Sequence, residues 1–355
     1  MNRRLTISAT LAIAAVGLAG CVDSGRDASG SGGSEQAECP WEADDSVTTT
    51  ARIAWQKVPT ADLIVKDRGV LEACMPEASV TWSNFASGGD VLQAYGGKSV
   101  DMGLVGSSPT TIALTKGQDR SLPIEVVWIH DIIGEAEALV VRDESATSIK
   151  DLEGGTIAVP FASTSHYSLL QALDEAGMDS NTDVKLINLE PDKMQSAFEG
   201  DQIDGAWVWN PVLDELKKSG KVVTSSADTA EFGTATYDLG TVTTSFAEEN
   251  PEFMDQWAKA QDYAVTMIRE EPDKAAESIG VQLGRDPGDV EPLFDQFEFL
   301  SADEQASDDY LGGQLGVNLH ETAGFLVQQG SITKASPETV YEDGVTPAFA
   351  DSVNQ

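Results

Sequence analysis

Basic residues are scarce in this sequence, which has 22 lysines and arginines against 59 aspartates and glutamates and a formal net charge of −37. A surface of that sign disfavours nucleic acid and anionic lipid headgroups as partners. Histidine is rarer still, and the three histidines, at positions 130, 166 and 320, lack the spacing of a metal site. Neither a GxGxxG motif nor a phosphate-binding loop is present. We therefore expect no cofactor and no metal.

The sequence also has few cysteines, three in all, and the first of them follows the N-terminal segment MNRRLTISATLAIAAVGLAG. A basic pair precedes an apolar run that is too short to span a membrane, as in a secretory signal. The end of the segment resembles the lipobox of bacterial lipoproteins. This resemblance implies a signal peptide over residues 1–20, lipidation of Cys21 and a flexible tether over residues 21–47 that starts rich in glycine and serine. The alternative is an ordinary signal peptide with a chance cysteine.

The two remaining cysteines are Cys39 and Cys74. An even remainder in an exported chain predicts a disulfide between them, because the compartment outside the cytosol is oxidising. Two buried free thiols are the alternative.

The most informative stretch covers residues 156–211 and alternates strand and helix patterns. An apolar strand runs into the hydroxyl cluster Ser163-Thr164-Ser165, and a helical pattern follows. The start of a helix exposes unpaired N–H groups and the positive end of the helix dipole, so a strand that leads into such a start favours an anion. A second strand and a short helix come next, and the stretch ends on a third, apolar strand that carries Trp207 and Trp209. This order indicates an α/β fold with ligand at the carboxyl ends of the strands.

An internal sequence repeat indicates two similar α/β lobes. Residues 97–109 and 200–211 align with one gap, and each has a helix end, an acidic turn, a buried strand and a proline. The length also exceeds that of a usual single domain. We expect one lobe from residues 48–138 and 239–355 and the other from residues 139–238. Residues 137–141 and 237–242 would be the crossing segments, and the C-terminal helices would return to the first lobe.

Hydroxyl side chains at two helix starts are the predicted anion donors: Ser107 and Ser108 from one lobe, and Thr164 and Ser165 from the other. Plain helix capping needs the same residue types, and this alternative stays open. His166 and Tyr167 follow at once and are predicted as neighbours of the ligand.

Aromatic and acidic side chains complete the predicted site. Trp207 and Trp209 alternate along one strand and can wall a small organic ligand, although such pairs are more often core. Glu137 and Asp238 lie inside apolar segments, where a charge is costly unless it is paired. They would bind a cation on the ligand or, alternatively, form a salt bridge with Lys or Arg.

Three motifs carry a family resemblance: VPFASTSHYSLLQAL, INLEP and GDQIDGAWVWNP. They resemble the taurine-binding proteins of bacterial ABC importers, within the wider sulfonate- and nitrate-type binding proteins, and the likeness spans residues 52–330. It implies a type II periplasmic-binding-protein fold in which Glu137 and Asp238 face the ammonium of the ligand and Gln56 lies in the first-strand motif. Lys57 and the Leu-Gly-Thr segment after Asp238 depart from the family pattern.

The resemblance and the export signal together predict a lipid-anchored binding protein on the outer face of the bacterial cytoplasmic membrane. It would bind taurine between two lobes and deliver it to an ABC permease and its ATPase subunits. The alternatives are another alkanesulfonate, nitrate or a thiamine precursor as ligand, or an enzyme on the same fold that uses His166. No nucleophile and base stand at a useful spacing, which favours binding over catalysis.

Overall fold

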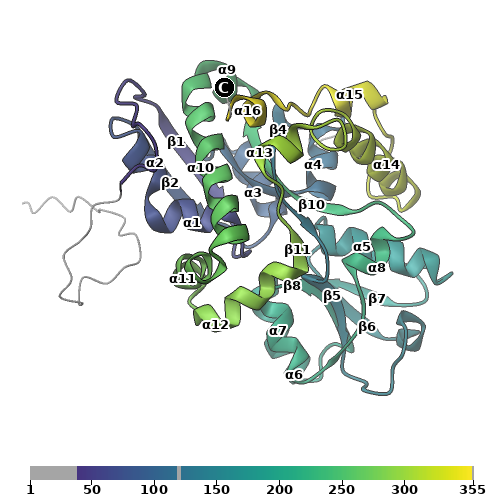
Figure 1. Cartoon of the computed structure of the whole chain (residues 1–355). Helices are drawn as coiled ribbons and strands as arrows, with labels where there is room; N and C mark the ends of the chain where they lie inside the picture. The colour runs from purple at the N-terminus through teal and green to yellow at the C-terminus, as the bar shows by residue number, and fades with distance from the viewer. Residues whose placement is uncertain (1–37, 118–120, 354–355) are drawn as a thin grey trace, which may run out of the picture.

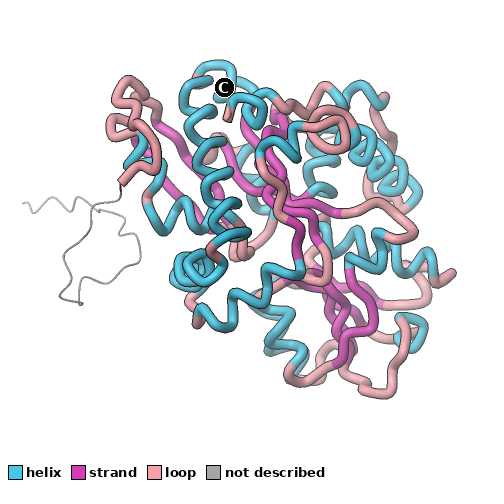
Figure 2. The backbone as a smooth tube through the Cα atoms, in the orientation of Figure 1, coloured by secondary structure: helices cyan, strands magenta, loops and turns pink. Residues whose placement is uncertain are grey.

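The computed structural model of the chain describes residues 38–117 and 121–353. The predicted signal peptide and Cys21 lie outside the described residues. Two mixed sheets, each covered by helices, form two lobes (Figures 1 and 2), as the sequence predicted. Within the described residues no helix has the length and the apolar character needed to span a membrane.

The first lobe contains a six-stranded sheet in the order β11-β4-β10-β3-β1-β2. Its strands are β1 (Thr50–Trp55), β2 (Ser79–Asn84), β3 (Met102–Gly106), β4 (Ile124–Ile133), β10 (Thr236–Thr243) and β11 (Phe297–Glu298). The helices of its N-terminal part are α1 (Ala61–Arg68), α2 (Val70–Cys74), α3 (Gly88–Gly96) and α4 (Ser107–Leu114).

The second lobe contains a five-stranded sheet in the order β7-β6-β8-β5-β9. Its strands are β5 (Glu137–Val141), β6 (Thr156–Val159), β7 (Lys185–Asn188), β8 (Gly205–Trp209) and β9 (Lys221–Ser225). Its helices are η1 (Ile149–Leu152), α5 (Thr164–Glu175), α6 (Pro191–Glu199), α7 (Val212–Lys217) and α8 (Ser226–Ala230).

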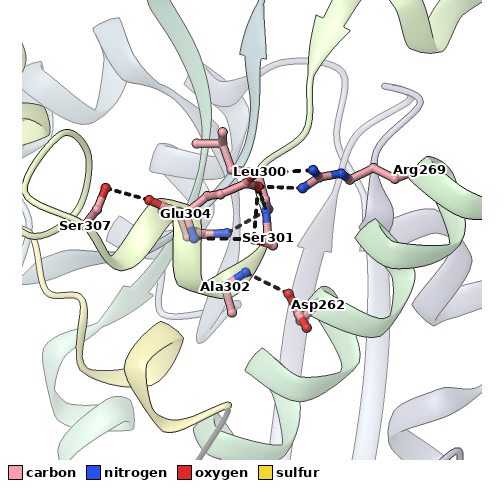
Figure 3. A network of polar contacts seen from close by, with 8 residues as sticks. Asp262, Arg269, Leu300, Ser301, Ala302, Glu304 and Ser307 are labelled. Atoms are coloured by element: carbon pink, nitrogen blue, oxygen red, sulfur yellow. Dashed lines mark hydrogen bonds and ion pairs between the residues drawn. The ribbon is translucent and has the colours of Figure 1, made fainter.

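The C-terminal part is helical apart from β11 and packs mainly on the first lobe, with α10 and α11 against α1. The helices are α9 (Thr244–Glu249), α10 (Pro251–Glu270), α11 (Pro272–Leu283), α12 (Pro287–Val290), η2 (Glu291–Gln296), α13 (Ala302–Ala306), α14 (Gln314–Gln328), α15 (Glu338–Glu342) and α16 (Ala348–Ser352). Figure 3 shows how α13 is joined to α10: Arg269 pairs with Glu304, and the Ala302 N–H donates to Asp262. The Arg269 hydrogen bond holds the pKa of Glu304 down at about 2.

The sequence repeat of residues 97–109 and 200–211 corresponds to a repeated structural unit. In each lobe a non-glycine residue with positive φ, Lys98 at 54° or Asp201 at 57°, turns the chain from a helix into a central strand. Two carboxylates then repeat one contact: Asp101 accepts from the Arg52 N–H of β1, and Asp204 accepts from the Thr156 N–H of β6. The repeated turn and acid therefore fix each central strand against its parallel neighbour.

The two segments predicted as crossings are strands. Residues 137–141 form β5, which lies in the sheet of the second lobe, and residues 237–242 belong to β10, which lies in the sheet of the first. The chain changes lobes just before each strand, within residues 134–136 and 231–235. Each sheet thus receives one antiparallel strand directly from the other lobe, and that strand begins where the parallel strands end.

The C-terminal part also braces the first crossing. The carbonyl of Gln296 accepts from the N–H groups of Gly134 and Ala136 at 3.1 and 3.4 Å, and the Asn210 Nδ2 donates to Gln296 Oε1 at 2.8 Å. Both lobes therefore contact the same residue of η2.

Two helix starts of the first lobe border the sheet. Ser87 caps α3, because its hydroxyl accepts from the Asp90 N–H. The helix α4 begins at Ser107 with Gly106 as its N-cap, so Ser107 and Ser108 lie inside the first turn and neither caps the helix.

Cys39 and Cys74 form a disulfide with a Cα–Cα distance of 4.8 Å, which joins the first described residues to the end of α2. A bridge that closes this 35-residue separation stabilises the fold by about 4 kcal/mol on the loop-entropy model.

Candidate functional site

A cavity lies between the lobes at the carboxyl ends of the central strands. Its lining comes from both lobes and from the helix starts that follow those strands: Gln56, Val58, Gly88, Gly106, Pro109, Glu137, Ser163, Thr164, Trp209 and Asp238. The topology brings the acids here, because an antiparallel strand begins at the edge where its parallel neighbours end. Glu137 is paired with Trp209 at the end of β8, and Asp238 with Gly106 at the end of β3.

The cavity is nearly closed, with a volume of about 20 Å³, which is room for a single water molecule. The lobes meet where Gly106 faces Thr164. A Cβ on Gly106 would lie 2.7 Å from Thr164 Cγ2, so the absence of a side chain at this position permits the close approach. A larger ligand requires the lobes to stand further apart than in this conformation.

Glu137 is the best-contacted acid of the cavity and is almost fully buried. The Thr164 hydroxyl donates to its Oε1 at 2.6 Å, and the Ser226 hydroxyl donates to its Oε2 at 3.3 Å. Burial raises the pKa of Glu137 to about 8; the Thr164 hydrogen bond opposes this shift and the nearby Asp238 adds to it. Burial likewise raises the pKa of Asp238 to about 7.

Neither acid has a basic partner. Among the described residues no Lys, Arg or His forms an ion pair with Glu137 or Asp238. The salt-bridge alternative is therefore absent from the described part of the chain. Ionised, these carboxylates leave the cavity with negative charge that only a cationic group could offset.

Helix starts also border the cavity, and two of them lie beside the acids: Thr164 contacts Glu137, and Gly106 is paired with Asp238. Three of them converge: Gly88 at the start of α3, Gly106 before α4, and Ser163 with Thr164 at the start of α5. The sequence predicted the second and third of these as anion sites but not the start of α3. First-turn N–H groups and aligned helix dipoles suit an oxyanion.

Five of the predicted ligand residues line the cavity: Gln56, Glu137, Thr164, Trp209 and Asp238. Six others do not: Ser107, Ser108, Ser165, His166, Tyr167 and Trp207. Gln56 is oriented by its Nε2, which donates to the Leu104 carbonyl at 3.0 Å.

The six predicted residues that do not line the cavity either contact other parts of the protein or are buried beneath the lining. The Ser107 hydroxyl accepts from the Tyr237 N–H, while Ser108 and Ser165 are buried in the first turns of their helices. The Tyr167 ring packs edge-on against Phe325 of α14. These contacts join α4 to β10 and α5 to α14.

The remaining two are His166 and Trp207. The His166 ring stacks on Phe161 at 4.7 Å, its Nδ1 accepts from the Ala162 N–H, and burial lowers its pKa to about 4. Trp207 is fully buried in the core of the second lobe, two residues before Trp209, which reaches the cavity because it ends the strand.

The structure also shows where two departures from the family pattern lie. Lys57 is exposed and does not line the cavity. Gly240 gives space to the first lobe's core: a Cβ there would lie 2.8 Å from Trp128 Cβ and 3.0 Å from the Trp257 ring, and those two rings pack edge to face.

Sequence reasoning missed two polar residues near the acids, Ser226 and Asp131, and named Ser163 only as part of a hydroxyl cluster. Ser163 caps α5 and lines the cavity, Ser226 contacts Glu137 from the start of α8, and Asp131 of β4 is paired with Asp238 across the sheet. Of these residues, only Asp131 could have been found from the sequence, because it is a charged residue inside the apolar run of β4. Across residues 38–117 and 121–353 no three His, Cys, Asp or Glu side chains are arranged to hold a metal.

Comparison with known proteins supports the fold and places the chain in a family. Among solved structures, the alkanesulfonate-binding protein SsuA from Xanthomonas axonopodis pv. citri bound to MOPS has a TM-score of 0.65 at 21% identity, covering 85% of this chain and 97% of that one. The predicted type II periplasmic-binding-protein fold is confirmed. The desulfurization enzyme DSZB shares the fold with a TM-score of 0.62 at 16% identity, covering 86% of this chain and 99% of that one.

Sequence relatives decide the family. The taurine-binding periplasmic protein of Escherichia coli (strain K12) is 35% identical over 278 residues, which cover 77% of this chain and 84% of that protein. The model of the NMT1-like family matches residues 47–282. Because this match spans well over half of the sequence, the chain belongs to the NMT1-like family.

Proposed function

We propose that the chain is an extracytoplasmic solute-binding protein of a bacterial ABC importer and that its ligand is taurine. The observation that carries the proposal is the pair of buried carboxylates, Glu137 and Asp238, which line the cavity without a basic partner in the described part of the chain. An ammonium group on the ligand would supply the missing positive charge.

The helix starts around the cavity support a sulfonate on the ligand. A sulfonate spreads one negative charge over three oxygens, so it suits several neutral N–H donors better than one cation. Three helix starts border the cavity, at Gly88, Gly106 and Thr164. A zwitterion would satisfy both the acids and the helix starts when the lobes close around it.

The comparisons support this ligand class. A taurine-binding protein is similar over most of the chain, and a solved neighbour is an alkanesulfonate-binding protein. Trp209, opposite Glu137 in the strand pairing, would cover the short carbon chain and exclude water.

A binding role is also favoured over catalysis. The cavity lining holds Ser163 and Thr164 as hydroxyl groups, and both are already engaged: the Ser163 hydroxyl donates to the Pro160 carbonyl and Thr164 donates to Glu137. His166 does not line the cavity and accepts a backbone N–H through Nδ1. The hydroxyls of Ser163 and Thr164 are thus hydrogen-bonded to groups other than the His166 ring, which is the base that the enzyme alternative invokes.

We further propose lipid attachment through Cys21 and docking to a permease with its ATPase subunits. The predicted tether over residues 21–47 is too long at its C-terminal end, because Cys39 is bonded to Cys74 and Val47 is buried, so we propose a tether that ends before Cys39. The lipobox-like segment and the similarity to periplasmic proteins support this location. Radiolabelled palmitate should enter the full-length chain expressed in bacteria and be absent from a Cys21→Ser variant.

Calorimetry with a ligand panel tests the proposed function. Purified protein should bind taurine more tightly than ethanesulfonate, nitrate, a thiamine precursor or an amino acid of similar size. A hundredfold excess of taurine over its Kd should stabilise the fold by about 2.7 kcal/mol. Tighter binding of ethanesulfonate or nitrate than of taurine would replace the proposal with a simple sulfonate or oxyanion carrier.

A further inference from the structure

Three buried hydroxyl groups are linked to the Glu137 carboxylate. The Thr164 hydroxyl donates to its Oε1 at 2.6 Å, and Ser226 Oγ lies 3.3 Å from its Oε2. Behind Ser226, the Oγ of Ser168 lies 3.0 Å from Ser226 Oγ. Ser168 and Ser226 are fully buried and do not line the cavity. The two serines therefore form a short hydroxyl chain that ends on one oxygen of Glu137, whereas Thr164 holds the other.

The start of α8 brings Ser226 to this position. Ser225 caps the helix and forms a capping box with Asp228, so the first turn of α8 has a fixed start. In the sheet, Ser225 at the end of β9 is paired with Ala138 of β5. The next residue along the chain, Ser226, therefore lies beside Glu137, which precedes Ala138.

The Ser226 hydroxyl has a single proton and two neighbours that can accept it. An ionised Glu137 only accepts, so Ser226 then donates to Oε2, and Ser168 can donate to Ser226. A protonated Glu137 still accepts from Thr164 at Oε1, so its own proton lies on Oε2 and is donated to Ser226, whose proton turns to Ser168. The chain therefore keeps Oε2 hydrogen-bonded in both protonation states of Glu137.

No cation among the described residues replaces the hydroxyl groups as support for the Glu137 charge. The elements packed against β5 are β8, β9, α5 and α7, and none of their charged residues forms an ion pair with Glu137: Lys221, His166, Asp174, Glu175, Asp214, Glu215 and Lys217. Lys221 is paired with Val141 at the far end of β5. The first-lobe acids that interact with Glu137, Asp238 and Asp131, carry the same sign.

The electrostatics of Glu137 agree with this arrangement. Burial raises its pKa to about 8 and Asp238 adds to the shift, whereas the hydroxyls of Thr164, Ser165 and Ser226 oppose it. A hydroxyl that donates to a carboxylate favours the ionised form, which is the form that an ammonium needs.

The chain belongs entirely to the second lobe. Glu137 is on β5, Thr164 and Ser168 are one turn apart on α5, and Ser226 starts α8. Asp238, by contrast, comes from β10 in the first lobe. The contacts of Glu137 with its hydroxyl donors therefore do not depend on how far apart the lobes stand.

We infer that Ser226, backed by Ser168, is a positioning residue for recognition of the ammonium: its hydroxyl holds Glu137 Oε2 before the lobes close and reverses its direction of donation when Glu137 takes up or loses a proton. This inference rests on the proposed function and deepens it. When the ammonium enters a site with protonated Glu137, the carboxyl proton leaves to solvent, and Ser226 turns its own proton from Ser168 to Glu137. The remaining acceptor sites of the carboxylate then receive the ammonium.

Ser226→Ala tests the inference through the pH profile of binding. Without the donor, the pKa of Glu137 should rise, so the loss of affinity should be greatest where Glu137 is mostly protonated. Taurine should bind about tenfold more weakly than to the unmodified protein at pH 6.5, and less than about threefold more weakly at pH 9. An equal loss at both pH values would overturn the inference, because a purely structural change does not act through the proton.

Two further variants check the chain itself. Ser168→Ala should change the pH profile in the same direction as Ser226→Ala and by a smaller factor, and an unchanged profile would overturn the role of Ser168. Thr229→Val is the matched control, because it removes a buried hydroxyl of α8 that donates to the Ser226 carbonyl and not to Glu137. Its profile should follow that of the unmodified protein, and a shift as large as in Ser226→Ala would count against a specific hydroxyl.

A titration of the ligand-free protein separates this inference from the proposed function. Infrared spectroscopy should show a protonated carboxyl band that Glu137→Gln removes and that titrates with a midpoint of about pH 8. The midpoint should rise by about one pH unit in Ser226→Ala and stay in place in Thr229→Val. If taurine fails to bind but the midpoint rises, the ligand is wrong and the role of Ser226 stands; if the midpoint does not move, the inference is wrong whatever the ligand.

Discussion

Asp238→Asn should separate recognition of the ammonium from recognition of the sulfonate. Asp238 lies near the start of β10 and lines the cavity. It is almost fully buried and has no basic partner among the described residues. In the variant, taurine loses one of its two carboxylate partners. Ethanesulfonate, which has no amine, loses nothing and is spared the burial of one negative charge. The two ligands should therefore respond differently to a single change.

The magnitude follows from the contacts. A hydrogen bond to a charged group contributes about 1.5–3 kcal/mol, which corresponds to an affinity loss of about 10- to 150-fold for taurine. The loss stops short of abolishing binding because Glu137, with its two hydroxyl donors, remains for the ammonium. For ethanesulfonate we expect a change below about threefold, or a gain, since a buried unpaired charge has been removed.

Titration calorimetry at pH 8.5 is the appropriate assay, because burial raises the pKa of Asp238 to about 7 and the carboxyl is then ionised. Asp90→Asn is the matched control: Asp90 is an acid in the first turn of α3 that does not line the cavity. This control removes the same formal charge from the same lobe. Equal losses for taurine and ethanesulfonate in Asp238→Asn would refute the assignment of Asp238 to the amine.

Three further predictions concern pH, the disulfide and lobe motion. Taurine affinity should increase from about pH 6 to about pH 8.5, because burial raises the pKa of Glu137 to about 8 and of Asp238 to about 7, and the ammonium needs both ionised; calorimetry in buffers of different ionisation enthalpy should show proton release, and a flat profile would contradict this. Thiol labelling of the unreduced, unfolded mature protein should leave Cys39 and Cys74 unmodified, and two labelled sulfurs there would disprove their pairing. Small-angle scattering should give a smaller radius of gyration with saturating taurine, and no change despite calorimetric binding would argue against hinge closure.

Local sequence patterns were enough to predict the repeated units of the two lobes. The turn into each central strand, with its following acid and strand, is encoded within about a dozen consecutive residues, so the segments 97–109 and 200–211 align in the sequence alone. The position of the acids at the cavity was harder to derive from composition or spacing. It depends on an antiparallel strand starting at the edge where its parallel neighbours end, which is a property of the assembled sheet.

The residues that sequence reasoning missed depend on pairing between distant segments. Asp131 gains its meaning from register with Asp238, and Ser226 from a contact with Glu137 that is 89 residues away in sequence. The exact start of a helix mattered as well. Because α4 begins at Ser107, the hydroxyl of that residue accepts from the Tyr237 N–H, and the cavity is bordered instead by Gly106 and Pro109.

The same acids that recognise an ammonium also bear on when the lobes close. In the closed arrangement, Gly106 lies against Thr164 and little space remains around Glu137 and Asp238. Without a cation, closure buries two carboxyl groups that must either stay protonated or carry unpaired charge, and raised pKa values are the sign of that cost. A zwitterion held between the lobes, with Gly106 and Thr164 further apart than here, removes the cost and contacts both the acids and the helix starts, so its binding energy favours lobes closed around the ligand over open lobes. An amine-free sulfonate contacts the helix starts but leaves the acids unpaired, and we therefore expect it to bind without closing the lobes as fully as taurine does.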